Sequence, residues 1–258
     1  MKKALLLSLS FALSAPLDAA TSVDRIDTET STELRYSWPD EGLTFQLNKP
    51  DAQHFRGVKR YSPQLAARHV RHQVLRNAAQ IQQQGIQVKL SPANLPLSYQ
   101  LNGPDPKKVE AAALQLQQIE QTAYRNYLHQ GYFYLLKLPN NPPVVIPDHL
   151  RFLQLSLNDL KPVAAAFGAR YGQQNIREVA SKLALWIQKI PYQDLSNRQA
   201  SAGSGYSPPL QLMLEHRGDC DSKAVLFAGV MKLMFPRTQI RMVYFRDHAV
   251  IADRKSVV

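Results

Sequence analysis

The sequence is poor in the residues that build covalently cross-linked or metal-based scaffolds. It contains a single cysteine, Cys220, so no intrachain disulfide and no cysteine-rich zinc site can form. With 11 Gly and 45% hydrophobic residues, the composition excludes collagen-like and fully disordered classes. No stretch beyond residue 20 is apolar for the roughly 18 residues that a membrane-spanning helix needs. We expect a folded mature chain without a transmembrane segment.

Acidic residues are also scarce. The chain has 20 Asp and Glu against 31 Lys and Arg, which gives a formal net charge of +11. Such a charge favours anionic surroundings, which include nucleic acid, a membrane surface or an acidic cell-wall polymer. A solvated basic surface without a specific partner would have the same composition.

The first 20 residues indicate the compartment. A basic start, Met1-Lys2-Lys3, precedes an apolar run from Ala4 to Ala15, and small residues follow. This run is too short to cross a bilayer and has the layout of a secretory signal peptide. We therefore predict a periplasmic or secreted protein. Export argues against nucleic acid as a partner.

The remaining chain divides into two predicted modules. Residues 21–35 are polar and are expected to form a mobile leader. Hydrophobic periodicity predicts helices over 62–84 and 105–130 with short strands around them, which gives an α+β module of unknown role over 36–147. The Pro- and Asn-rich segment 139–143 has the composition of a linker. Residues 148–258 form the second module, in which Pro162 is expected to break or kink a helix.

The lone cysteine lies in the segment Gly218-Asp219-Cys220-Asp221-Ser222-Lys223-Ala224, which leads into a helical pattern. Asp219 is a favourable helix N-cap and places Cys220 in the first turn. There the helix dipole favours a thiolate, so we expect the pKa of the thiol to fall. His248 opens a later strand, which gives the Cys-then-His order of papain-like chemistry. An inert buried cysteine and an unrelated surface histidine would also fit this spacing.

This segment, followed by an apolar helix, a strand and Asp247-His248-Ala249, resembles the core of bacterial transglutaminase-like cysteine peptidases. The stretches 186–192 and 205–211 resemble the segments that precede the cysteine in that family. The resemblance covers residues 172–252 and implies a papain-like core of helices packed on an antiparallel sheet. It also implies Cys220 as nucleophile and His248 as base. Tyr206 is a candidate oxyanion ligand beside the Cys220 backbone N–H.

The family's third triad residue, an acid on the strand after the histidine strand, has no counterpart here. Asp253 follows His248 too closely, and Asp247 is its strand neighbour and so points to the opposite face. Asp219 and Asp221 are expected to cap the cysteine helix. We therefore expect an incomplete core in a C-terminally shortened chain of weak or no activity. Residues 253–258, whose possible codons match a sequencing adapter, are expected not to be native.

These observations lead to two hypotheses. In the first, the chain is an exported cysteine peptidase or amidase, a hydrolase that cleaves amide bonds of a protein, peptide or cell-wall peptide through a thioester. Water is the expected acceptor of the acyl group, and transfer to an amine, as in a transglutaminase, is the alternative. In the second, it is a non-catalytic envelope binding module with the same fold. We expect no cofactor and no metal, because His69 and His72 have a ligand-like spacing but no third ligand. The oligomeric state is left open.

Overall fold

The computed structural model describes residues 22–38, 41–49, 60–82, 84–138, 140–195, 205–244 and 249–253. The fold is α+β, and all of its named strand pairs are antiparallel. The chain forms two compact units. Unit 2 is Arg60–Pro147, and unit 1 combines the residues before and after it.

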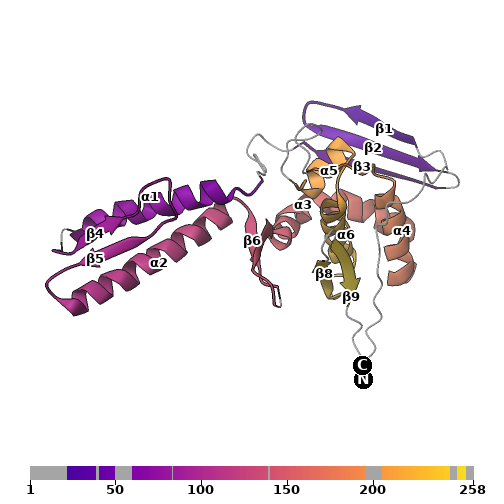
Figure 1. Ribbon diagram of the computed structural model, residues 1–258. Helices are drawn as coiled ribbons and strands as arrows, with labels where there is room; N and C mark the ends of the chain where they lie inside the picture. The colour runs from indigo at the N-terminus through magenta and orange to yellow at the C-terminus, as the bar shows by residue number, and fades with distance from the viewer. Residues whose placement is uncertain are drawn as a thin grey trace, which may run out of the picture. The chain divides into compact units, whose positions relative to one another are not determined.

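Unit 2 consists of two long helices and two hairpins. Helix α1 (Pro63–Gln82) and helix α2 (Pro106–Gln130) lie side by side (Figure 1). A hairpin of β4 (Gln87–Leu90) and β5 (Tyr99–Asn102) connects them, and β6 (Phe133–Leu136) pairs with β7 (Val144–Pro147) after α2. The core of unit 2 is the apolar stripe that the two helices share, and its α1 members are Val70, Val74, Ala78 and Ile81.

Unit 1 contains one sheet, four helices and one hairpin among its described residues. The sheet has the strand order β1 (Ser22–Asp27), β2 (Ser31–Trp38), β3 (Glu41–Asn48). The helices are α3 (His149–Tyr171), α4 (Ile176–Gln188), α5 (Pro209–Glu215) and α6 (Cys220–Met234). The hairpin pairs β8 (Ile240–Tyr244) with β9 (Ala249–Asp253).

The sheet packs on the helices through one aromatic cluster. Strands β2 and β3 alternate buried and exposed positions, as a strand with one covered face does. The Trp186 indole of α4 lies edge-on to Tyr36, with ring centroids 5.4 Å apart, and to Phe45 at 5.8 Å. It also meets Phe167 of α3 at 5.4 Å. Trp186 therefore joins the sheet, α3 and α4 into one core.

Helix α6 is the central helix of unit 1. Its residues from Ser222 to Met231 are buried on every side, which is the pattern of a helix surrounded by other elements. It contacts α3, α4, α5, β8 and β9. A Cβ atom at Gly229 would lie 2.4 Å from Leu160 Cδ1, so α6 and α3 approach each other closely at that point.

The structure corrects two expectations about the N-terminal half. Residues 21–35, expected as a mobile leader, contain β1 and most of β2, because Thr32 and Leu34 are buried in the sheet. Residues 36–38 and 41–49 belong to unit 1 and not to a module ending at 147, because the apolar face of β2 and β3 is covered by α3 and α4.

Two prolines also behave differently from expectation. Helix α3 continues through Pro162 without a break, because buried Leu160, Val163 and Phe167 hold both sides of the proline in one core. The linker-like segment around Pro142 lies between paired strands, since Leu136 of β6 pairs with Val144 of β7. It connects the two strands of a hairpin within unit 2.

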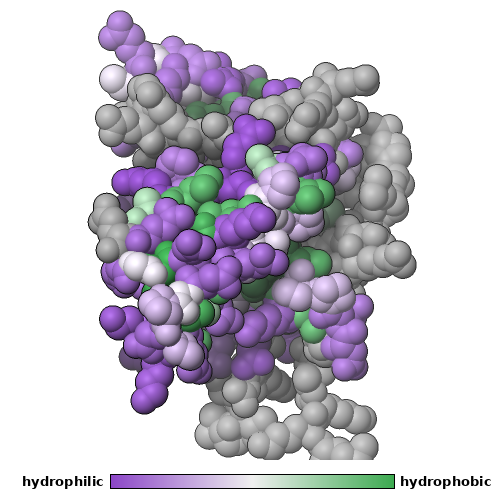
Figure 2. Space-filling model, turned by 60° about the vertical axis from the view of Figure 1, so that its left-hand side comes forward, coloured by the Kyte–Doolittle hydropathy of each residue, from purple (hydrophilic) through white to green (hydrophobic). Residues whose placement is uncertain are grey.

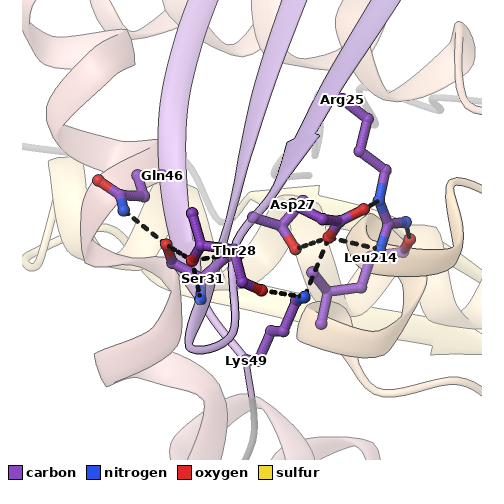
Figure 3. A network of polar contacts seen from close by, with 8 residues as sticks. Arg25, Asp27, Thr28, Ser31, Gln46, Lys49 and Leu214 are labelled. Atoms are coloured by element: carbon purple, nitrogen blue, oxygen red, sulfur yellow. Dashed lines mark hydrogen bonds and ion pairs between the residues drawn. The ribbon is translucent and has the colours of Figure 1, made fainter.

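A polar network holds the turn between β1 and β2 and reaches α5 (Figure 3). Arg25 Nε donates to Asp27 Oδ2 at 2.6 Å, and a further Arg25 nitrogen donates to the backbone oxygen of Leu214. Thr32 Oγ1 donates to Asp27 Oδ1 at 2.7 Å, and Lys49 Nζ lies 3.3 Å from the same oxygen. These donors hold the pKa of Asp27 well below its usual range.

The face of the molecule in Figure 2 is predominantly polar. Figure 2 shows one face on which hydrophilic residues predominate and hydrophobic residues appear in small groups between them. None of the helices in the described part of the chain combines the length and the apolar character needed to cross a membrane.

Candidate active site

The first turn of α6 presents Cys220 at the edge of the core. Asp219 is the N-cap, and its Oδ1 accepts a hydrogen bond of 2.9 Å from the backbone N–H of Ser222. Cys220 is partly exposed, whereas the helix residues from Ser222 to Met231 are buried. Cys220 and Asp221 therefore lie where solvent reaches this central helix, next to its capped N-terminus.

Two neighbouring loops fix this turn. Gly218 forms an isolated parallel β-bridge with Tyr192. The Gly218 N–H donates to Pro191 O at 3.2 Å, and the Gly218 carbonyl accepts from Gln193 N at 3.0 Å. On the other side, the Ser207 N–H donates to Ser222 Oγ at 2.8 Å. The segment after α4 and the segment before α5 are thus both attached to the turn that carries Cys220.

The electrostatic surroundings of Cys220 differ from the sequence expectation. Burial raises the pKa of the thiol, and the carboxylates of Asp219 and Asp221 raise it further. Lys223 and the backbone at the helix start act in the opposite direction but are the weaker influences. The expectation that the helix N-terminus lowers this pKa is therefore wrong for the described surroundings. Two adjacent negative charges and desolvation outweigh the dipole.

A buried histidine of α3, His149, lies next to the cysteine turn. Its side chain is 2% exposed, and its Nε2 lies 3.6 Å from Oδ2 of Asp221. Its Nδ1 lies 2.7 Å from the hydroxyl oxygen of Tyr244 in β8, with the two rings stacked at 5.6 Å. The ring of Tyr206 packs against the imidazole from a third side, at 5.0 Å between centroids.

The partners of His149 define its protonation state. Burial lowers the pKa of His149 to about 4, so the imidazole is neutral near pH 7. The Tyr244 hydroxyl has two acceptors within reach, His149 Nδ1 at 2.7 Å and Met242 Sδ at 3.3 Å. Because an imidazole nitrogen is the stronger acceptor, the hydroxyl donates to Nδ1. We therefore assign the proton of the neutral ring to Nε2, where it faces the Asp221 carboxylate.

Asp221 and Lys223 are the remaining charged groups of this turn. Burial and the neighbouring Asp219 carboxylate raise the pKa of Asp221 to about 6. Lys223 is 5% exposed, and its Nζ donates to Ile190 O at 2.5 Å, while burial lowers its pKa. One cationic and two anionic side chains thus act on the thiol through their charges.

The structure brings together some of the predicted site residues. Asp219, Cys220 and the segment of Tyr206 meet at the α6 turn. Tyr206 is 1% exposed, with its ring 4.6 Å from that of Phe152, and its oxyanion role stays a prediction. His248 and Asp247 lie outside the described residues, as do the predicted signal peptide and residues 254–258.

Other candidate positions are placed away from this turn. Asp253 is the last residue of β9 and pairs with Ile240, so its backbone belongs to the hairpin. His69 and His72 lie in unit 2, where the His69 ring packs against Tyr127. Among the described residues, no three His, Cys, Asp or Glu side chains are grouped so that they could hold a metal ion.

Sequence reasoning missed His149 and Tyr244. They are far from Cys220 in the chain, and neither belongs to a recognisable motif. The one local signal is Asp148, which caps α3 by accepting from Arg151 N at 3.1 Å and so fixes His149 at the start of that helix. Nothing in the sequence indicates that this helix start lies against the cysteine turn.

Comparisons with protein-family models, with curated protein sequences and with solved structures find no significant match to this chain.

Proposed function

We propose that the chain is an exported cysteine hydrolase that acts on amide bonds of a protein, peptide or cell-wall peptide substrate. The observation that carries the proposal is the partly exposed Cys220 at the capped start of a buried central helix, with the β8–β9 hairpin packed against that helix. A thiol in this position can be reached by substrate while its backbone is held rigidly. The arrangement supports the transglutaminase-like core inferred from the sequence resemblance.

In the proposed reaction the Cys220 thiolate attacks the amide carbonyl carbon and forms an S–C bond. The protonated imidazole of His248 then acts as the acid. It gives its proton to the amide nitrogen as the C–N bond breaks and the amine leaves. Water then adds to the thioester carbon and gives a proton to His248. The S–C bond breaks, which restores the thiolate and releases the carboxylic acid. The backbone N–H of Cys220 is the candidate donor to the oxyanion.

Because the pKa of the Cys220 thiol is raised, the proposal requires a positive charge that stabilises the thiolate. The described neighbours of Cys220 oppose thiolate formation, so the counter-charge must come from His248. A neutral alkylating agent such as iodoacetamide reports the thiolate directly, and Cys220 is the single cysteine of the chain. We expect labelling at pH 6.5 to be at least about tenfold faster in the unmodified chain than in His248→Ala. His72→Ala, at an exposed helix position, serves as the control.

The alternative function, a binding module with this fold, predicts a different result. Labelling would then rise with pH as for an ordinary thiol with a raised pKa, and His248→Ala would leave the rate unchanged. That outcome would reject the hydrolase proposal. Rapid labelling that depends on His248 would reject the binding module without catalysis.

A further inference from the structure

Polar side chains from three elements meet beside the cysteine turn, and the His149 imidazole among them is buried. His149 comes from the start of α3, Tyr244 from the end of β8, and Asp221 from the first turn of α6. Each contact joins elements that are distant in the chain. The Nδ1 to Tyr244 hydroxyl distance is 2.7 Å, and the Nε2 to Asp221 Oδ2 distance is 3.6 Å.

From this geometry we infer that His149 is a positioning residue, which ties the Tyr244–Ala249 end of the β8–β9 hairpin to the start of α3, beside the helix turn that carries Cys220. Tyr244 is the last paired residue of β8 and stands opposite Ala249 of β9. In the sequence, Ala249 directly follows His248. An anchor at Tyr244 therefore holds the end of the hairpin whose residue Ala249 is the chain neighbour of the base of the proposed reaction. The inference rests on the proposed function in this respect.

The groups around His149 hold its imidazole in one orientation, in which it bonds Tyr244; we call this hydrogen bond the bridge. Tyr244, Asp221 and the ring of Tyr206 face the imidazole from β8, α6 and the segment before α5. The neutral ring accepts from Tyr244 at Nδ1. Its Nε2 lies 3.6 Å from Asp221 Oδ2, which is beyond hydrogen-bond distance. Because the side chain is 2% exposed, water offers it no competing partner. A charged imidazole is also disfavoured by that burial.

Three substitutions at two positions separate the His149–Tyr244 bridge from general packing. Tyr244→Phe removes the hydroxyl and keeps the stacked ring. His149→Leu removes both nitrogens, whereas His149→Asn retains an acceptor at the position of Nδ1. The matched control is Tyr134→Phe, which removes a hydroxyl from an exposed tyrosine of unit 2.

The first measurement is amide hydrogen exchange of β8 and β9 in the full chain. We expect faster exchange of these strands in Tyr244→Phe and His149→Leu, partial recovery in His149→Asn, and no change in Tyr134→Phe. The effects of Tyr244→Phe and His149→Leu should not add in the double variant, because both break one bridge. Unchanged exchange in both single variants would overturn the anchor.

The second measurement is iodoacetamide labelling of Cys220 at pH 6.5 and at pH 10. We expect both bridge variants to slow labelling at pH 6.5 by at least about tenfold, since small misplacements of a catalytic group have large effects. At pH 10, where the thiolate forms without a base, the rates should agree with those of the unmodified chain. If His248→Ala is labelled slowly while both bridge variants are labelled at the normal rate, the positioning role is rejected and the hydrolase proposal stands.

If the unmodified chain is itself labelled slowly at pH 6.5, the hydrolase proposal fails, and the catalytic part of this inference fails with it. The exchange data then still decide whether the anchor exists.

Discussion

His149 Nε2 and Asp221 Oδ2 lie 3.6 Å apart, and the pKa values of the two groups are displaced in opposite directions. Burial lowers the pKa of His149 from 6.5 to about 4 and raises that of Asp221 from 3.8 to about 6. Near pH 7 the pair therefore consists of a neutral imidazole and a carboxylate. The two shifts have opposite consequences for stability as the pH changes.

The pH dependence of stability should reveal this opposition. Between pH 4 and 6.5 the unfolded chain binds more protons at His149 than the folded chain does, so this histidine lowers stability as the pH falls. Between pH 3.8 and 6 the folded chain binds more protons at Asp221, so the carboxyl group raises stability as the pH falls. In the unmodified chain the two contributions offset each other.

Asp221→Asn removes one of these contributions and leaves the other. We expect this variant to lose stability more steeply than the unmodified chain as the pH falls from 6.5 to 4, measured by denaturant unfolding at several pH values. Asp24→Asn, the same change at an exposed position of β1, should keep the original pH profile. Parallel curves for Asp221→Asn and the unmodified chain would contradict the assignment.

Two positions in the first turn of α6 should respond differently to alanine. Cys220→Ala should change the free energy of unfolding by less than about 1 kcal/mol, because the side chain is partly exposed. Ser222→Ala should cost about 1–3 kcal/mol, because the Ser207 N–H loses its acceptor at a buried site. Chemical denaturation of both variants makes the comparison. Equal losses would contradict the described packing.

If the chain is a hydrolase, the same two variants separate catalysis from folding. Turnover should disappear in Cys220→Ala, which retains its stability, and should persist in Ser222→Ala under conditions where that variant is folded. Retained turnover in Cys220→Ala would end the cysteine mechanism.

Two helical glycines form a matched pair: Gly168 of α3 borders open space, and Gly229 of α6 faces α3. At Gly168 a new Cβ meets nothing within 4 Å, so Gly168→Ala should stabilise the protein by about 0.5–1 kcal/mol through helix propensity. At Gly229 a Cβ would lie 2.4 Å from Leu160 Cδ1, and Leu160 is fully buried. Gly229→Ala should therefore destabilise by about 1–3 kcal/mol. Thermal unfolding distinguishes the two, and a gain at both positions would contradict the close helix contact.

The network at the β1–β2 turn should control the order of the edge strand. Asp27→Asn removes the charge that Arg25 and Lys49 share, so hydrogen exchange of β1 should become faster while α6 keeps its protection. Asp24→Asn, elsewhere on β1, is the control and should leave the exchange unchanged. Equal exchange in Asp27→Asn and the unmodified chain would show that the Arg25 contact with Leu214 suffices.

Local patterns in the sequence were sufficient for the helices of unit 2 and for the capped start of α6. The periodic apolar residues from Val70 to Ile81 and the cap at Asp105 are local signals, and the structure has helices at both places. The same kind of signal identified Asp219 as a cap. These features depend on residues within a few turns of one another.

The parts that the sequence did not predict depend on long-range contacts. Thr32 and Leu34 stand in a polar stretch and become a strand because α3 and α4 cover one face of the sheet. Pro162 stays within a helix because both of its flanks are buried in one core. The raised pKa of Cys220 follows from burial, which a local dipole argument does not include. His149 reaches the cysteine turn through the tertiary fold alone.

The division of unit 1 into two chain segments sets an order of events during synthesis. Strands β2 and β3 are made before unit 2, and Trp186, which covers Tyr36 and Phe45, is made after it. A nascent chain therefore carries an uncovered apolar sheet face while the whole of unit 2 is translated. Surfaces of this kind attract chaperones and favour aggregation. The yield of folded protein should accordingly depend on how quickly the segment from α3 to α6 follows.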